Sequence, residues 1–176
     1  MASLFSFGED AGTSTGSPSK GTTRNYGLAD CNWKNATGIA DSYSGNPITA
    51  GGNSFVKYQF GAISGSFNTI SNGKWAHTSG TFGAGLTLRG HVTSGYSTPT
   101  TGTLGSGSDI TATGTIAASG ITVLFHSGGP EYAISGSISS VPTGYSQYLV
   151  TQLQTTTGAA PGDTATATLT FQFDES

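Results

Sequence analysis

The sequence of this chain predicts an all-β fold, either an antiparallel β-sandwich or a jelly roll. The stretch TATATLTFQF at residues 164–173 alternates apolar and polar residues from Ala165 onward, which is the period of a half-buried strand. About eight to ten short runs of strand-forming residues are separated by turn signals, at the spacing typical of sandwiches and barrels. No window of about 11 residues keeps the 3.6-residue period of a helix. The connections between the runs are too short for helical crossovers, which favours antiparallel pairing.

An extended, mostly irregular N-terminal arm and linker is expected over residues 1–50. The stretch from Gly12 to Gly21 is rich in Gly, Ser and Thr, a composition typical of a flexible link. Apolar residues are scattered through the arm without a period, so we expect them to contact a partner. These candidate anchors are Leu4, Phe5, Phe7, Tyr26 and Trp33.

The β-sandwich itself is predicted over residues 51–176. The run ITVLFH at residues 121–126 is the most continuously apolar one, and we expect it to be buried on both faces. Asn72-Gly73 is a hairpin signal, and residues 94–108 are expected to form a long loop. In the final strand we expect one face to be buried: Ala165, Ala167, Leu169, Phe171 and Phe173. The other predicted strands are Phe55–Phe60, Ile63–Ile70, Lys74–Thr78, Thr81–Val92, Ile110–Ile116, Tyr132–Ser139 and Tyr145–Leu153.

The composition excludes several classes of function. Only 9% of the residues are charged, against about 25% in an average globular domain. The formal net charge is −3, and the six Lys and Arg residues are scattered along the chain. Nucleic-acid binding requires a clustered basic surface. We therefore expect no nucleic-acid partner, and a surface whose solubility depends on uncharged polar groups.

The cysteine content and the N-terminal segment bear on where the protein works. Cys31 is the single cysteine, so no internal disulfide can form, and we expect a buried or interface thiol. The first 21 residues lack the basic segment and the apolar run of a signal peptide. No stretch approaches the roughly 18 consecutive apolar residues of a transmembrane helix. We expect a protein made without an export signal and without a membrane partner, although its composition is typical of extracellular surface proteins.

Catalytic motifs do not occur in a context that supports them. Gly12–Gly16 matches G-x-S-x-G, but a nucleophile elbow requires a strand before it and a helix after it. The three histidines lie in or beside different predicted strands, without H-x-H spacing. We therefore expect no enzyme, no metal site and no cofactor. An enzyme would require at least two residues of one set to converge in a single pocket: His77, His91, His126, Asp109 and Glu131.

Three aromatic residues are candidates for contacts in the sandwich domain. Trp75, Tyr96 and Tyr145 lie in or near predicted loops and strand ends. Exposed aromatic rings could stack on sugar rings as a glycan platform. The favoured interpretation places them in the core or in a subunit interface, where Trp and Tyr are enriched.

In composition and strand pattern, the chain resembles the accessory structural proteins of tailed-bacteriophage virions, namely capsid decoration or cement proteins and head or tail fibres. The resemblance lies in the N-terminal MASLFSFG, the segment NGKWAHTSGTFGAGLTLRG, the missing signal peptide and the strand ATATLTFQF. It implies a jelly roll or sandwich, often trimeric, that binds the major capsid protein or another virion protein through an arm or a flat base. It also implies a protein made in the host cytoplasm that works in the virion.

The leading hypothesis is thus a non-enzymatic decoration-type subunit that oligomerises, as a trimer, and attaches to the shell through residues 1–50. Deleting residues 2–21 is then expected to leave folding intact and to weaken attachment. Two alternatives stay open. One is a carbohydrate-binding or adhesive sandwich at a fibre tip. The other is a tail-tube or tail-tip subunit that extends its sheets between protomers through unpaired edge strands.

Overall fold

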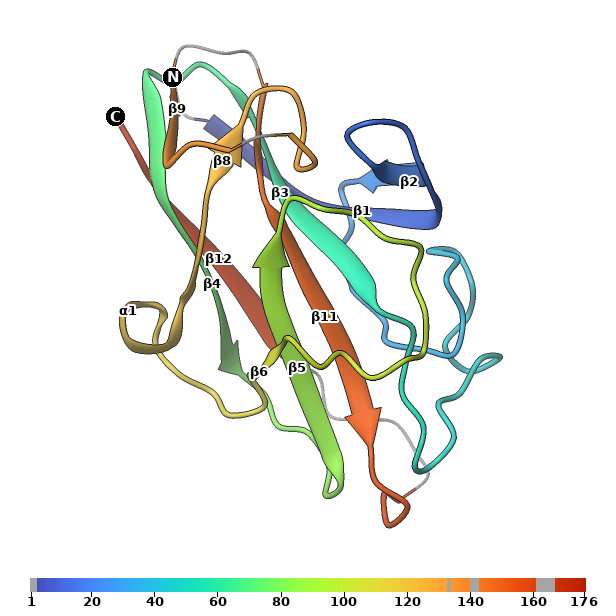
Figure 1. The fold of residues 1–176 in the computed structure, drawn as a ribbon. Coiled ribbons are helices and arrows are strands. Elements are labelled where there is room, and N and C mark those ends of the chain that lie inside the picture. The colour runs from blue at the N-terminus through green and yellow to red at the C-terminus, as the bar shows by residue number, and fades with distance from the viewer. Residues whose placement is uncertain (1–2, 133, 140–142, 161–166) are drawn as a thin grey trace.

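The computed structural model describes residues 3–132, 134–139, 143–160 and 167–176. Its strands pair antiparallel in two sheets that pack face to face, which confirms the all-β sandwich (Figure 1). The strand order does not confirm the jelly-roll alternative. Sheet A runs β2 (Lys20–Tyr26), β1 (Ser3–Thr15), β3 (Lys57–Gly65), β11 (Tyr148–Thr155), β5 (Leu86–Thr93) and β6 (Ser108–Asp109), with β10 (Thr143–Ser146) on β3 and β8 (Phe125–His126) on β10. Sheet B runs β12 (Thr168–Glu175), β4 (Thr69–Ser79) and β7 (Ile121–Val123), with β9 (Ser137–Ser139) on β4; a single-turn helix, α1 (Ile116–Ser119), precedes β7.

The N-terminal segment belongs to the sandwich. β1 pairs with β3 along one edge and with β2 along the other, so the prediction of an irregular arm is wrong for residues 3–26. Phe5 stacks on Phe171 of sheet B at 5.0 Å between ring centroids. The physical reason is the alternation of Phe5 and Phe7, which sends both rings to the same face of a strand. The Gly/Ser/Thr-rich stretch from Gly12 to Gly21 forms the end of β1, the turn that follows it and the start of β2. Residues 27–50 contain no strand and remain irregular, as predicted.

Sheet A carries apolar side chains on both faces. Its inner face, with Ile63 and Leu149, packs against Ile70 and Trp75 of sheet B. On the outer face a second cluster is covered by Tyr96 and Leu104, both from the loop between β5 and β6. The members of this second cluster alternate with the inner-face residues along β3 and β11. They are Tyr58, Phe60, Ala62, Tyr148 and Val150.

The last strand has the orientation that its alternation predicts, in the part that the structure describes. Leu169, Phe171 and Phe173 pack against the inter-sheet core. Thr168 and Gln172 are exposed on the opposite face; Ala165 lies outside the described residues. At the end of β12, the Glu175 carboxylate accepts hydrogen bonds from the backbone N–H and the hydroxyl of Ser3, at 3.1 and 2.6 Å. The first and last described strands are therefore joined at one corner.

Asn72-Gly73 does not form the predicted hairpin. Both residues lie inside β4, and two residues of β4 there oppose one residue of β12, between the pairs Gln172–Lys74 and Asp174–Ser71. Asn72 adopts a left-handed conformation with φ of 53°, and its side chain donates to Asp174 Oδ2 at 2.7 Å. The conformational freedom that suits this dipeptide to a hairpin is used for a β-bulge. The chain reverses earlier, between Gly65 and Thr69.

The apolar run at residues 121–126 is not a strand buried on both faces. It is divided between β7 of sheet B and β8 of sheet A, with Thr122 exposed. Val123 and Phe125 are fully buried in the inter-sheet core. The run is apolar because it passes from one sheet to the other across the interior.

Deleting residues 2–21 is now expected to abolish cooperative folding, because it removes β1, which pairs with both β2 and β3 in sheet A, together with the Phe5 and Phe7 side chains. Thermal unfolding followed by circular dichroism tests this. Leu4→Ser is the matched control, since the Leu4 side chain is 68% exposed, and a change within about 0.5 kcal/mol is expected there. A deletion variant with an unchanged unfolding midpoint would contradict this account of β1.

Candidate functional site

A buried ionic network occupies the outer face of sheet A. Asp10 accepts two hydrogen bonds from Arg24, at 2.6 and 2.7 Å, and a third from the Tyr148 hydroxyl at 2.5 Å. The same guanidinium donates to Glu131 at 2.7 Å and lies over the Phe60 ring at 5.3 Å from its centroid. One cation therefore neutralises two carboxylates, of which Asp10 has a fully buried side chain. A bidentate guanidinium is the geometry that best compensates for burying such charges.

A second ionic group lies on the inner face of the same sheet. Glu9 pairs with Lys57 at 3.0 Å, and both side chains are buried. Burial raises the pKa of Glu9, and the Lys57 ammonium opposes this shift. The loop of residues 27–56 contributes Lys34, whose ammonium donates to the carbonyls of Ile39 and Asp41. Both hydrogen bonds lie within the loop and fix its conformation, and neither Lys34 nor Lys57 faces solvent.

Cys31 belongs to this inner group. Its sulfur lies 4.0 Å from Glu9 Oε2. Burial, and next the Glu9 carboxylate, raise the pKa of the thiol well above its ordinary value. A nucleophilic cysteine requires the opposite shift, so the predicted role as a packed thiol fits the environment.

Tyrosine side chains form an exposed patch on the outer face of sheet A, which we call the tyrosine patch. It consists of Leu4, Tyr26, Tyr132, Tyr145 and His126. Tyr26 is 50% and Tyr132 40% exposed. Tyr145 pairs with His126 across β10 and β8, and His126 stacks on Tyr132 with 5.1 Å between the ring centroids. Burial, and next a hydrogen bond with Tyr26, raise the pKa of Tyr145 to about 12.

The candidate anchor residues divide between this patch and the interior. Leu4 and Tyr26 are exposed on the patch. Phe5 and Phe7 pack between the sheets, so their predicted role as arm anchors is wrong. Trp33 belongs to the loop of residues 27–56 and is half-buried, and its indole nitrogen donates to Thr151 Oγ1 of β11 at 3.0 Å. The alternation of Phe5 and Phe7 with Ser6 is the sequence signal that could have assigned both phenylalanines to a strand.

Two of the three aromatic candidates in the sandwich domain are core residues. Trp75 is 2% exposed and contacts the rings of Phe7 and Phe171. Tyr96 is 3% exposed, and its hydroxyl donates to Gly12 O at 2.7 Å. Only Tyr145 keeps an exposed part. The glycan-platform interpretation is therefore wrong for Trp75 and Tyr96, and the favoured core placement holds for both.

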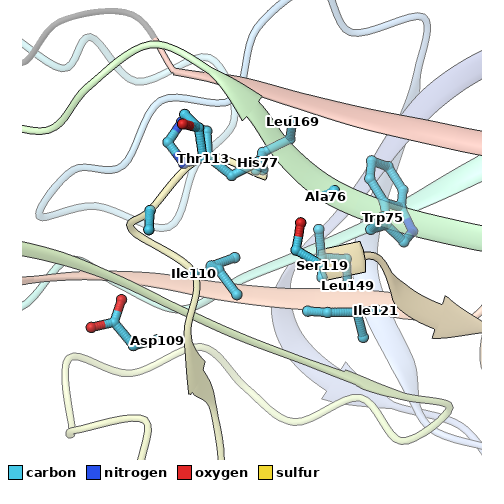
Figure 2. Close-up of a pocket in the computed structure, with 11 residues that line it drawn as sticks. Trp75, Ala76, His77, Asp109, Ile110, Thr113, Ser119, Ile121, Leu149 and Leu169 are labelled. Atoms are coloured by element: carbon cyan, nitrogen blue, oxygen red, sulfur yellow. The ribbon is translucent and has the colours of Figure 1, made fainter. Parts of the chain in front are cut away.

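A cavity of about 210 Å³ opens between the sheets, beside the segment that connects β6 to β7 (Figure 2). Most of its lining is apolar and comes from Trp75, Ile110, Ile121, Leu149 and Leu169. His77, Thr113, Ser119 and Asp109 add polar groups. The connecting segment is held in place by Gly114, whose N–H donates to His77 O at 2.9 Å.

Of the five residues that an enzyme would draw on, the cavity brings together only two, His77 and Asp109. His77 and Asp109 both line the cavity, but Figure 2 shows them on different sides of it, with the carboxylate turned away from Ser119 and Ile121. Asp109 Oδ1 instead accepts from Thr111 N–H at 2.9 Å, and this hydrogen bonding lowers the pKa of Asp109. His91 and His126 lie on sheet A, away from this cavity. Among the described residues, no group of three or more His, Cys, Asp and Glu could hold a metal ion.

Comparison with protein-family models, with curated proteins and with solved structures finds no match to this chain. Within the described part of the chain, no helix has the length and apolar character needed to cross a bilayer.

Replacing Arg24 by Met is expected to lower the free energy of unfolding by about 3–5 kcal/mol, because it leaves the buried Asp10 and Glu131 without their cation. Chemical denaturation at neutral pH measures this change. Lys20→Met on the same strand is the control, since Lys20 is exposed and makes no ion pair within the described residues. Equal stabilities of the two variants would contradict a structural role for the network.

Alkaline pH is expected to unfold the protein through its enclosed tyrosines. Burial raises the pKa of Tyr96, Tyr145 and Tyr148 above the ordinary value near 10. The folded chain therefore keeps protons that the unfolded chain has released, so stability falls as pH rises above about 10. Denaturation midpoints between pH 8 and 12 measure this fall. Tyr148→Phe is expected to make it less steep, and an unchanged slope would show that Tyr148 ionises normally.

Proposed function

We propose that this protein is a non-enzymatic structural subunit of a virus particle, of the capsid decoration or cement type, which associates as a trimer and attaches to a shell protein. The observation that carries the proposal is the tyrosine patch. Leu4, Tyr26 and Tyr132 are three of the four large apolar or aromatic residues that are well exposed among the described residues, and all three belong to this patch. Tyrosine is enriched in protein interfaces because its ring is apolar and its hydroxyl can still bond.

The distribution of charge supports the same proposal. Three of the six Lys and Arg residues, namely Arg24, Lys34 and Lys57, are engaged inside the fold. The outer surface is consequently dominated by Gly, Ser and Thr. Copies of such a surface can pack side by side at high density without the repulsion that a strongly charged surface would produce.

The ordered N-terminus changes how attachment would occur. A flexible arm would lose about 1–2 kcal/mol of entropy per residue on binding. Four members of the tyrosine patch lie on paired strands, so their backbone is already fixed: Leu4, Tyr26, His126 and Tyr145. Attachment through a preorganised face is therefore favoured over attachment through an arm.

A tail-tube or tail-tip subunit is the second candidate, and the edge of β12 favours it. Among the described residues, β12 pairs with β4 alone, so one edge of an eight-residue strand is available for another chain. Electron microscopy of the concentrated protein distinguishes the candidates. Rings or tubes would favour the tail subunit, and discrete trimers favour the decoration subunit.

The virion assignment is tested by immunoblotting virus particles purified from the source of this gene, where we expect the chain to be a stoichiometric component. Light scattering after size exclusion is expected to give the mass of three copies of the 17.7 kDa chain.

The double variant Tyr26→Ser/Tyr132→Ser is expected to reduce both incorporation into particles and trimer formation. Tyr43→Ser is the matched control, because Tyr43 is equally exposed but lies in the loop of residues 27–56. Absence from the particles would overturn the virion assignment, and a monomer in solution would overturn the trimer.

A further inference from the structure

We infer that the cavity between the sheets is a binding site for a small neutral aromatic alcohol, a ring of phenol size whose hydroxyl donates to His77. This inference does not depend on the proposed function. The cavity holds about 210 Å³, and an apolar protein cavity of about 150 Å³ is sufficient to bind benzene.

His77 defines the polar requirement of the site. Its side chain is 3% exposed, and Nε2 lies 2.9 Å from the carbonyl oxygen of Ser79. Because a carbonyl can only accept, Nε2 carries the proton and donates, which makes Nδ1 the acceptor of the neutral ring. Nδ1 is buried and has no hydrogen-bond partner. Such a group is costly to leave unsatisfied, and a ligand hydroxyl in the cavity would satisfy it.

The rest of the lining selects against other ligand classes. Leu149, Leu169 and Ile121 are apolar, and Trp75 adds an aromatic ring. A sugar would bring several hydroxyl groups, whereas the lining offers His77, Thr113, Ser119 and the buried, unpaired indole N–H of Trp75 beside the outward-turned Asp109 (Figure 2). An anionic ligand would lose its hydration without gaining an opposite charge, and the Asp109 carboxylate that could attract a cation is turned away from the apolar interior (Figure 2). An aromatic ring with one hydroxyl matches both the apolar walls and the single buried acceptor.

The mouth of the site lies at the surface. Asp109, Ala112, Thr113 and Ser119 are exposed residues of the segment that leads from β6 through α1. A ligand can therefore reach the apolar interior beside this segment without separation of the two sheets.

Nuclear magnetic resonance titration of the ¹⁵N-labelled full-length chain with phenol, benzene and galactose tests the inference. Phenol is expected to give saturable shifts confined to the cavity segments and to move the His77 Nδ1 resonance. Benzene is expected to bind about tenfold more weakly, because it cannot donate a hydrogen bond. Absence of saturable shifts with phenol, equal affinities for phenol and benzene, or binding of galactose alone would each overturn the inference.

Substitution of the acceptor gives a second test. His77→Phe keeps a ring in the lining and is expected to remove the preference for phenol over benzene. His126→Phe is the matched control, because His126 Nδ1 already accepts from Gly128 N–H at 2.7 Å and lies outside the cavity. If His77→Phe does not fold, the His77 Nδ1 resonance of the unmodified protein decides the question, and a resonance that phenol leaves unmoved would overturn the role of His77.

Discussion

The fold depends on how two consecutive carboxylates are neutralised. Glu9 and Asp10 are neighbours on β1, so the alternation of a strand sends them to opposite faces of sheet A. Glu9 meets Lys57 on the inner side, and Asp10 meets Arg24 and Tyr148 on the outer side. A slip of one residue in the pairing of β1 would place each carboxylate on the wrong face, without its partner. The two ion pairs therefore specify a single register for the N-terminal strand, and with it the positions of Phe5 and Phe7 in the core.

The same arrangement explains why charged side chains of β1, β2 and β3 are enclosed in the fold. Sheet A is covered on both faces, by sheet B on the inner face and by the β5–β6 loop on the outer face. Polar groups enclosed in this way require partners, and the ionic groups supply them. The outside carries hydroxyl groups, glycines, the tyrosine patch and scattered charges such as Asp41, Asp109 and Glu175. Stability and surface character are thus linked, because three of the six Lys and Arg residues are engaged inside the fold and not on the exterior.

The sequence predicts the fold class and the faces of the last strand well, because both follow from period-2 alternation over a continuous run. It fails for residues 3–26, where glycine and hydroxyl residues look like a linker although Gly21 is buried and the segment is paired throughout. It fails again at Asn72, because a left-handed residue serves a bulge as well as a turn. The candidate sites were harder still. Local patterns do not show that Arg24 and Glu131, or His77 and Ser119, are brought together by segments far apart in the sequence. Trp75 is likewise buried by strand partners that its neighbours in sequence do not indicate.

The corner contact between Ser3 and Glu175 has a consequence for assembly. A strand arriving at the start of β1 would need the Ser3 N–H as its hydrogen-bond donor, and the Glu175 carboxylate already occupies that group. A fixed negative charge beside an open strand end also discourages the approach of another backbone. This corner is therefore protected against the addition of a foreign strand. In the proposed trimer, association would be directed away from this corner and toward contact between whole faces, in which the identity of side chains can select the correct neighbour.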